Sequence, residues 1–195
     1  MFVEDAAIAL DEIAVVAPMG ASSRAGESRS VEQALARYLP VARLTPPATL
    51  DGGDVMRAGR RVFVGCSRRT NAVAIAQLRG LLAPYDYEVI PVEVKGALHL
   101  KSACSIVGAR TVLANTDWVD MSPFAGLDVL PVDASEPWSA SVLHAEGHVV
   151  MPTGFPRTAR MLGEQGLDVH EVDLTEIRKA EGGPTCLSIL LRNLP

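Results

Sequence analysis

The sequence predicts a single α/β domain, residues 1–195, made of repeated units that each contain two strands, a helix and a third strand (ββαβ). One reason is a recurring order of apolar run, tight polar turn and β-rich run, which returns at a spacing of roughly 38–50 residues. Another is helical spacing of apolar residues after at least three of these strand pairs. A third is length, because 195 residues suffice for one domain with a core and are few for two.

The strands are predicted in pairs joined by short turns. Apolar first strands are expected at 7–10, 54–56, 103–107 and 141–143, and their β-rich partners at 13–16, 61–65, 111–114 and 148–151. Glycine or polar residues separate the two members of each pair, which is typical of hairpins. An unrelated α+β sheet is the alternative to a repeat.

Helices and returning strands complete the units. One helical face is formed by Val31, Ala34, Leu35 and Tyr38, and another runs from Ala74 to Leu82. In the last unit Pro156 suits a first helical turn and Gly166 suits the stop. Returning strands are expected at 87–92, 127–132 and 167–172. A final strand, 187–191, has no unit of its own, and in a closed ring it would complete the first module.

Composition excludes several classes of partner. The net charge is -5 and aromatic residues make up 5%, so neither a basic face nor stacking platforms for nucleic acid are expected. No apolar run reaches the ~18 residues that span a bilayer. Three scattered cysteines do not suit a disulfide framework, and a reducing cytoplasm is predicted. The oligomeric state is left open, with a homodimer as one alternative.

Cys186 is the cysteine with a distinctive setting. It follows Gly182-Gly183-Pro184 and precedes the apolar terminal segment, so the backbone and thiol could approach a ligand closely. The alternative is a buried structural cysteine at a strand start. Cys66 and Cys104 follow or lie in apolar strands and are predicted to be packing residues.

Histidines provide one candidate and no metal motif. His99 lies in a loop between two predicted strands, whereas His144 and His148 flank a turn and His170 alternates with acidic residues, so these three are predicted to be surface residues. No His-x-x-x-His lies on a predicted helix and no Cys-x-x-Cys occurs, so no metal site is predicted. No phosphate-binding glycine motif occurs either, and no cofactor is expected.

Charged loop residues allow two interpretations each. Asp51 and Asp54 flank two glycines, which indicates either a turn entering a strand or carboxylates at a site that admits a substrate. Arg24 and Arg69 each lie in a loop after a strand. They are either surface residues or a pair of guanidinium forks for a carboxylate.

Together these pieces resemble the dimethylarginine dimethylaminohydrolase (dimethylargininase) family of the guanidine-modifying, pentein superfamily. The resemblance extends from Met1 almost to Pro195, and its motifs occur in family order. They are Phe2-Val3-Glu4-Asp5, Ser23-Arg24, Leu50-Asp51-Gly52-Gly53-Asp54, Phe63-Val64-Gly65 with Ser67-Arg68-Arg69-Thr70-Asn71, Leu98-His99-Leu100-Lys101-Ser102 and Thr185-Cys186. The resemblance implies a pentein-type α/β propeller, a ring of five ββαβ modules.

The resemblance also implies catalytic roles and a reaction. Cys186 would attack the guanidinium carbon, His99 would protonate the departing amine and then activate water, and Asp51 would orient His99. A methylated arginine would become citrulline through a covalent S-alkylthiouronium intermediate, with release of methylamine or dimethylamine. The chemistry is consistent, because guanidinium is a poor electrophile that needs a thiolate, acidic groups and a proton for the leaving nitrogen.

Four further positions would bind the substrate. The resemblance implies that Asp5, supported by Glu4, binds the guanidinium and that Arg24 and Arg69 hold the carboxylate. Arginine deiminases typically carry an aspartate two residues after the histidine. Lys101 stands there instead, as in dimethylargininases, which favours a methylated substrate over free arginine.

The start of the chain departs from the family pattern. Met1 aligns just before the family's Phe-Val-Glu-Asp, so the opening module, with its lid, is expected to be absent and the first module incomplete. A start codon placed too far downstream is the preferred explanation, and a natural fragment is the other. The alternatives to a hydrolase are an impaired fragment or paralogue that only binds guanidinium amino acids, an arginine deiminase-like enzyme, or an amidinotransferase.

Overall fold

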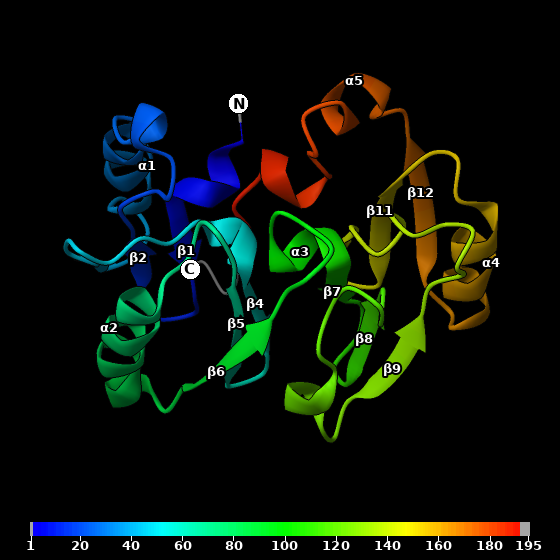
Figure 1. Ribbon diagram of the computed structural model, residues 1–195, viewed down its shortest axis with the longest axis horizontal. Coiled ribbons are helices and arrows are strands. Elements are labelled where there is room, and N and C mark those ends of the chain that lie inside the picture. The colour runs from blue at the N-terminus through cyan, green and yellow to red at the C-terminus, as the bar shows by residue number, and fades with distance from the viewer. Residues whose placement is uncertain (1, 192–195) are drawn as a thin grey trace.

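The computed structural model describes residues 2–191, which form four separate three-stranded sheets (Figure 1). The sheets are β1-β2-β3, β4-β5-β6, β7-β8-β9 and β10-β11-β12, in chain order. In every sheet the first two strands pair antiparallel and the third pairs parallel to the second. The predicted α/β repeat is therefore confirmed.

Strand bounds agree with the prediction to within a few residues. The first strands are β1 (Ala7–Ala9), β4 (Val55–Ala58), β7 (Cys104–Ile106) and β10 (Leu143–Ala145). The second strands are β2 (Ala14–Val16), β5 (Arg61–Cys66), β8 (Thr111–Ala114) and β11 (His148–Pro152). The third strands are β3 (Val41–Arg43), β6 (Glu88–Glu93), β9 (Asp128–Pro131) and β12 (Asp168–Val172). Strand β3 was not predicted, and β10 begins two residues later than expected.

Helices connect the second and third strands of three sheets and lie on the outside of the arc of sheets (Figure 1). They are α1 (Ser28–Leu35), α2 (Ala72–Leu82) and α4 (Pro156–Glu164), while the third unit uses only the 3-10 turn η5 (Ser122–Phe124). Asn71 caps α2 by accepting a hydrogen bond from the amide of Ala74. Gly166, with φ at 81°, follows α4 in the left-handed conformation that glycine tolerates. Tyr38, predicted on the face of α1, lies beyond its end and is exposed.

The hydrophobic core is divided among the junctions between neighbouring sheets. One cluster joins the first two units and includes Val15, Leu50 and Leu78. Between the second and third units the rings of Phe63 and Phe124 stack with centroids 4.5 Å apart. A third cluster joins the last two units. A single ββαβ unit cannot bury its own apolar face, so each unit depends on its neighbour.

The segment predicted as a terminal strand corrects one expectation. Residues 188–191 belong to no strand of the described chain, and they follow the 3-10 turn η6 (Thr185–Leu187). Ile189 and Leu191 nevertheless pack against the cluster formed by α1 and the first sheet, so the segment does return to the beginning of the chain. Its apolar side chains are used for packing, but its backbone joins no ladder. Within residues 2–191 each of the four sheets has three strands.

The cysteines divide differently from the prediction. Cys104 is buried, as expected, but Cys66, the last residue of β5, is exposed. Among the described residues there is no helix that is both long and apolar enough to traverse a lipid bilayer.

Candidate active site

Short helical turns at the centre of the arc carry the predicted site residues (Figure 1). The turn η1 (Val3–Ala6) directly precedes β1, η3 (Gly52–Asp54) precedes β4, and α3 (Leu100–Ala103) precedes β7. In space η1 contacts both η3 and η6, and η3 contacts α3. Equivalent positions of successive units therefore meet, which makes neighbours of segments that lie far apart in the sequence.

His99 and Asp51 form a buried pair. Nε2 of His99 lies 3.1 Å from Oδ2 of Asp51, whose other oxygen accepts a hydrogen bond of 2.8 Å from the amide of Gly20. Burial alone would raise the pKa of Asp51, but the hydrogen bonds from His99 and Gly20 outweigh it and hold that pKa below its usual range. Asp51 is therefore ionised and can accept a hydrogen bond from the imidazole.

The same surroundings favour the protonated imidazole. Burial lowers the pKa of His99, yet the hydrogen bond to Asp51 and the charges of Asp54 and Asp5 together raise that pKa above its ordinary value. A histidine with a raised pKa is a better-populated proton donor near neutral pH. The pair is thus suited to deliver a proton.

Asp5 lies beside this pair across a glycine. Its Oδ1 accepts a hydrogen bond of 3.2 Å from the amide of Gly53, and one ligand-type atom from each of Asp5, Asp51 and His99 lies within 4.8 Å of the others. A Cβ on Gly53 would come within 2.9 Å of both Asp5 Oδ1 and the His99 ring. Glycine at this position therefore allows the carboxylate and the imidazole to lie close together.

A guanidinium group already contacts Asp5, namely that of Arg24. Nη1 of Arg24 lies 2.6 Å from Asp5 Oδ2, while Nε and Nη2 donate to the carboxylate of Glu27 at 2.9 and 2.8 Å, and Nη2 also donates to the carbonyl of Phe2. The contacts with Glu27 and Asp5 raise the pKa of Arg24, although partial burial acts in the opposite direction. Arg24, predicted to hold a substrate carboxylate, is here paired with two carboxylates of the chain itself. Arg24 neutralises Asp5, and a protonated His99 neutralises Asp51. The charges of these two carboxylates are therefore balanced without a metal ion.

Arg69 is half-buried beside the Asp51 loop. Its amide donates to the hydroxyl of Ser67 at 3.0 Å, and its backbone packs so closely on Gly20 that a Cβ there would lie 2.6 Å from the Arg69 carbonyl oxygen. Its positive charge contributes to the lowered pKa of Asp51. In the described part of the chain Arg69 forms no ion pair, so its guanidinium is available to an anion.

Cys186 lies in η6 and is half-buried. Its Sγ accepts a hydrogen bond of 3.4 Å from the amide of Gly183. Burial raises the pKa of the Cys186 thiol, and the charges of Glu4 and Asp5 raise it further, while the Gly183 amide and Lys101 act in the opposite direction. The thiol is therefore protonated near neutral pH, and a cation bound beside Glu4 and Asp5 would favour the thiolate.

Glu4 and Lys101 form an ion pair next to the thiol, with Nζ 2.5 Å from Oε1. Burial raises the pKa of Glu4 in spite of Lys101. A cavity of about 160 Å³ lies against this pair and extends between the first strands of the units. A second cavity, of about 410 Å³, opens beside Gly183 and is lined by Trp138, Ser141 and Arg178. The cysteine turn thus has space on more than one side.

Asp54, which the sequence places either in a turn or among carboxylates of a substrate site, has no direct contact with substrate among its expected roles. It is fully buried and accepts three hydrogen bonds, from the hydroxyls of Ser67 and Thr70 at 2.6 Å each and from the amide of Leu100 at 3.0 Å. It thereby ties the loop that carries Arg69 to the start of the helix that follows His99. Its position as the second aspartate of Asp51-Gly-Gly-Asp54 was the available signal.

Known proteins resemble this chain in sequence and in fold. No family model matches the chain. The chain is 38% identical over 195 residues to an N(G),N(G)-dimethylarginine dimethylaminohydrolase of Streptomyces coelicolor, covering 100% of this chain and 75% of the relative. It is 31% identical over 191 residues to the enzyme of that name from Pseudomonas aeruginosa, covering 97% and 75%.

A solved structure of the Pseudomonas aeruginosa protein, a cysteine-to-serine mutant in complex with citrulline, is also similar. It superposes with a TM-score of 0.91 at 30% identity, covering 96% of this chain and 74% of that one. Sequence and fold therefore agree over nearly the whole described chain. On this evidence the chain belongs to the dimethylarginine dimethylaminohydrolase family.

Proposed function

We propose that this chain hydrolyses Nω-methylated arginine, as asymmetric dimethylarginine or monomethylarginine, to citrulline and dimethylamine or methylamine. The observation that carries the proposal is the convergence of a cysteine, a histidine–aspartate pair and a carboxylate that already accepts a guanidinium group. Arg24 supplies that guanidinium, 2.6 Å from Asp5. A substrate guanidinium would take over this contact, which would release Arg24 toward the substrate carboxylate beside Arg69.

The first half of the reaction uses the thiolate and the imidazolium. Substrate bound at Asp5, with Glu4 nearby, places a positive charge next to Cys186 and lowers the pKa of its thiol. The thiolate attacks the guanidinium carbon, forming a C–S bond. His99 then donates its proton to the methylated nitrogen, the C–N bond breaks, and the neutral amine leaves an S-alkylthiouronium intermediate.

The second half regenerates the enzyme. His99, now neutral and held by Asp51, removes a proton from a water molecule as that water attacks the same carbon. The C–S bond breaks, the sulfur leaves as a thiolate, and the new hydroxyl group loses its proton to solvent, which gives citrulline. One water is consumed and one amine is released, so no cofactor is required. Free cysteines fit a reducing cytoplasm as the place of this reaction.

Lys101 supports the preference for a methylated substrate. Its ammonium neutralises Glu4, so the carboxylate charge available to the unmethylated nitrogens of a free guanidinium is reduced. A methylated nitrogen has fewer N–H groups to satisfy and loses less in this setting. Free arginine is therefore expected to be the poorer substrate.

The test is citrulline formation by the purified 195-residue chain with asymmetric dimethylarginine, monomethylarginine and arginine as substrates. Cys186→Ser is expected to reduce turnover by at least about 10⁴-fold, as loss of a nucleophile does. Cys66→Ser, an exposed cysteine at the end of β5, is the matched control and should leave turnover unchanged. Binding of methylated arginine without citrulline, or a preference for arginine, would overturn the proposal.

A further inference from the structure

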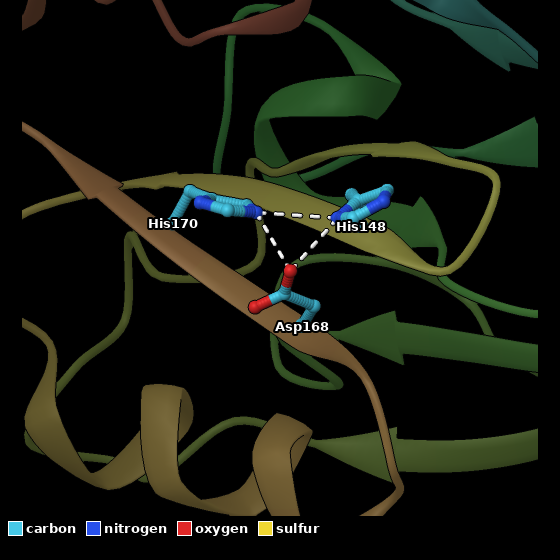
Figure 2. Close-up of side chains that lie close together, drawn as sticks. All are labelled: His148, Asp168 and His170. Carbon is cyan, nitrogen blue, oxygen red and sulfur yellow. Dashed lines mark hydrogen bonds and ion pairs between the residues drawn. The ribbon is translucent and has the colours of Figure 1, made fainter.

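A second cluster of histidine and carboxylate, separate from the candidate active site, lies on the solvent-exposed face of the fourth sheet, opposite α4 (Figure 2). It consists of His148 on β11 and of Asp168 and His170 on β12. Nδ1 of His148 lies 2.9 Å from Asp168 Oδ2, Nε2 of His170 lies 3.1 Å from the same oxygen, and the two nitrogens are 3.2 Å apart. Three atoms capable of binding a metal thus converge on one point.

Strand register produces this convergence. Strands β11 and β12 run parallel, with His148 opposite Asp168 and Val150 opposite His170. Side chains two residues apart share a face of a strand, so all three cluster residues lie on one solvent-exposed face, while Val149 faces the buried cluster that includes Leu162 of α4. Neighbouring strands therefore hold the cluster, which makes its geometry more rigid than that of a loop.

The triangle of donor atoms has the dimensions of a tetrahedral metal site. Bonds of about 2.0–2.1 Å at a tetrahedral zinc separate its ligand atoms by roughly 3.3 Å. The three sides of the triangle here are 2.9, 3.1 and 3.2 Å. A modest opening of the side chains would admit an ion at its centre.

Protons satisfy this triangle poorly. Each of the two nitrogens carries at most one hydrogen, and a carboxylate oxygen only accepts. If both nitrogens donate to Asp168, the two N–H groups face each other across 3.2 Å. A cation that receives electron pairs from all three atoms would satisfy every member at once.

We propose that His148, Asp168 and His170 bind one divalent transition-metal ion of the Zn²⁺ class. Two imidazole nitrogens and one carboxylate oxygen suit zinc or its neighbours, whereas Mg²⁺ and Ca²⁺ prefer oxygen ligands alone. The three side chains are between 52% and 60% exposed, so water can fill the fourth position. Such an ion would join β11 to the edge strand β12. The site is independent of the proposed hydrolysis.

Sequence spacing conceals this site. His148 and His170 are 22 residues apart, and no helical or Cys-x-x-Cys motif links them, so the expectation of no metal site followed from spacing alone. The pairing of two parallel strands supplies the proximity. This cluster is therefore the reason to revise that expectation.

The experiment is calorimetric titration of the chelator-treated full chain with Zn²⁺ alone. Wild type is expected to bind one equivalent more than the double variant His148→Ala/His170→Ala, whose affinity at this site should be at least about 100-fold weaker. The control is His144→Ala, because His144 lies opposite buried Val149 in the register of β10 and β11 and shares its face. The His144→Ala variant should still bind the additional equivalent of Zn²⁺. All three proteins retain Cys186, so any Zn²⁺ bound there contributes equally to the three titrations and does not affect the difference.

Imidazole nitrogen NMR supplies a measurement that does not depend on the variants. Addition of Zn²⁺ to wild type should shift Nδ1 of His148 and Nε2 of His170. The melting temperature of wild type should also rise by roughly 5–10 °C at a 100-fold excess over Kd, and that of the double variant should not. Equal stoichiometry and affinity in wild type and the double variant, or no shift at these nitrogens, would overturn the proposal.

Discussion

Two clusters in this molecule contain the same kinds of side chain in opposite surroundings. Asp5, Asp51 and His99, the inner cluster, are buried at the centre of the arc of sheets. His148, Asp168 and His170, the outer cluster, are exposed on β11 and β12. In both, the ligand-type atoms lie within 4.8 Å of one another. Proximity alone therefore does not distinguish a site that moves protons from one suited to bind a cation.

Burial and the neighbouring charges make the difference. In the inner cluster, hydrogen bonds and neighbouring charges outweigh burial, so the pKa of His99 is raised and that of Asp51 is lowered. Backbone amides of Gly20 and Gly53 fix the carboxylates in place. The outer cluster has neither feature, and water and salt screen its charges. Its members can rearrange around an ion, whereas the inner ones are held in fixed positions.

The largest expected effect is on turnover when the inner pair is broken. His99→Ala should lower citrulline formation by about 10²–10⁴-fold, because the leaving amine loses its proton donor. Asp51→Asn should give a loss of similar size, since the amide no longer holds the imidazole in a charged, oriented form. Steady-state kinetics with asymmetric dimethylarginine measure both variants.

His170→Ala is the counterpart in the outer cluster and should leave turnover unchanged. A comparable loss in His170→Ala would show that the two clusters are coupled. That result would remove the functional distinction between them.

Asp54→Ala is expected to lower the stability of the fold markedly, because Asp54 is a fully buried acceptor. The substitution leaves the hydroxyls of Ser67 and Thr70 and the amide of Leu100 without their acceptor. Buried donors without partners should cost about 3 kcal/mol of unfolding free energy in total. Urea denaturation provides the value.

Asp168→Ala, at an exposed carboxylate, is the matched comparison and should be close to neutral in the absence of metal. Equal losses of unfolding free energy in Asp54→Ala and Asp168→Ala would mean that burial does not explain the difference between the two regions.

Much of the fold was predictable because local chemistry and register agree. The hairpin between β10 and β11 has Glu146 and Gly147 at φ 52° and 85°, a turn that the sequence signals with glycine. Strand β3 was missed because Val41–Arg43 is short and only half-buried or exposed. The terminal segment was apolar enough for a strand, but strand formation needs a partner backbone, which composition does not reveal.

The site was predictable only through motifs whose spacing matches a known family. Those motifs bring Asp5, Asp51, His99 and Cys186 to contacting turns, while the role of each residue stays a prediction. Residue chemistry alone did not distinguish a structural from a catalytic role for Cys186. The contacts of Asp54 and the outer histidine cluster both arise from tertiary pairing, which no local pattern contains.

Gly53→Ala should have a smaller, local effect. Its new Cβ would push on Asp5 Oδ1 and the His99 ring at 2.9 Å, with an expected loss of about 1–3 kcal/mol in unfolding free energy. Gly80→Ala is the matched control, since it lies in α2 with open space around it and should gain roughly 0.5–1 kcal/mol. Denaturant midpoints measure both. A neutral Gly53→Ala would mean that the close approach across η3 is not needed.

The reactivity of Cys186 should respond to the charges beside it. Glu4→Gln removes a negative charge that raises the pKa of the thiol, so alkylation by iodoacetamide at pH 8 should become faster. Lys101→Met removes a positive charge and should make it slower. Cys66→Ser serves as the background, because Cys66 is exposed and Cys104 is buried. Unchanged alkylation rates in both variants would show that the charges of Glu4 and Lys101 do not influence the Cys186 thiol.

The smallest expected effect is that of His148→Ala in the presence of a chelator. Its contact with Asp168 joins two side chains that are 59% and 60% exposed, and such pairs contribute little because water competes and salt screens them. The melting temperature should change by less than about 2 °C. Scanning calorimetry of the metal-free variant checks this. A larger loss would mean that the outer cluster stabilises β11 against β12 by itself, and burial would no longer explain why the two clusters differ.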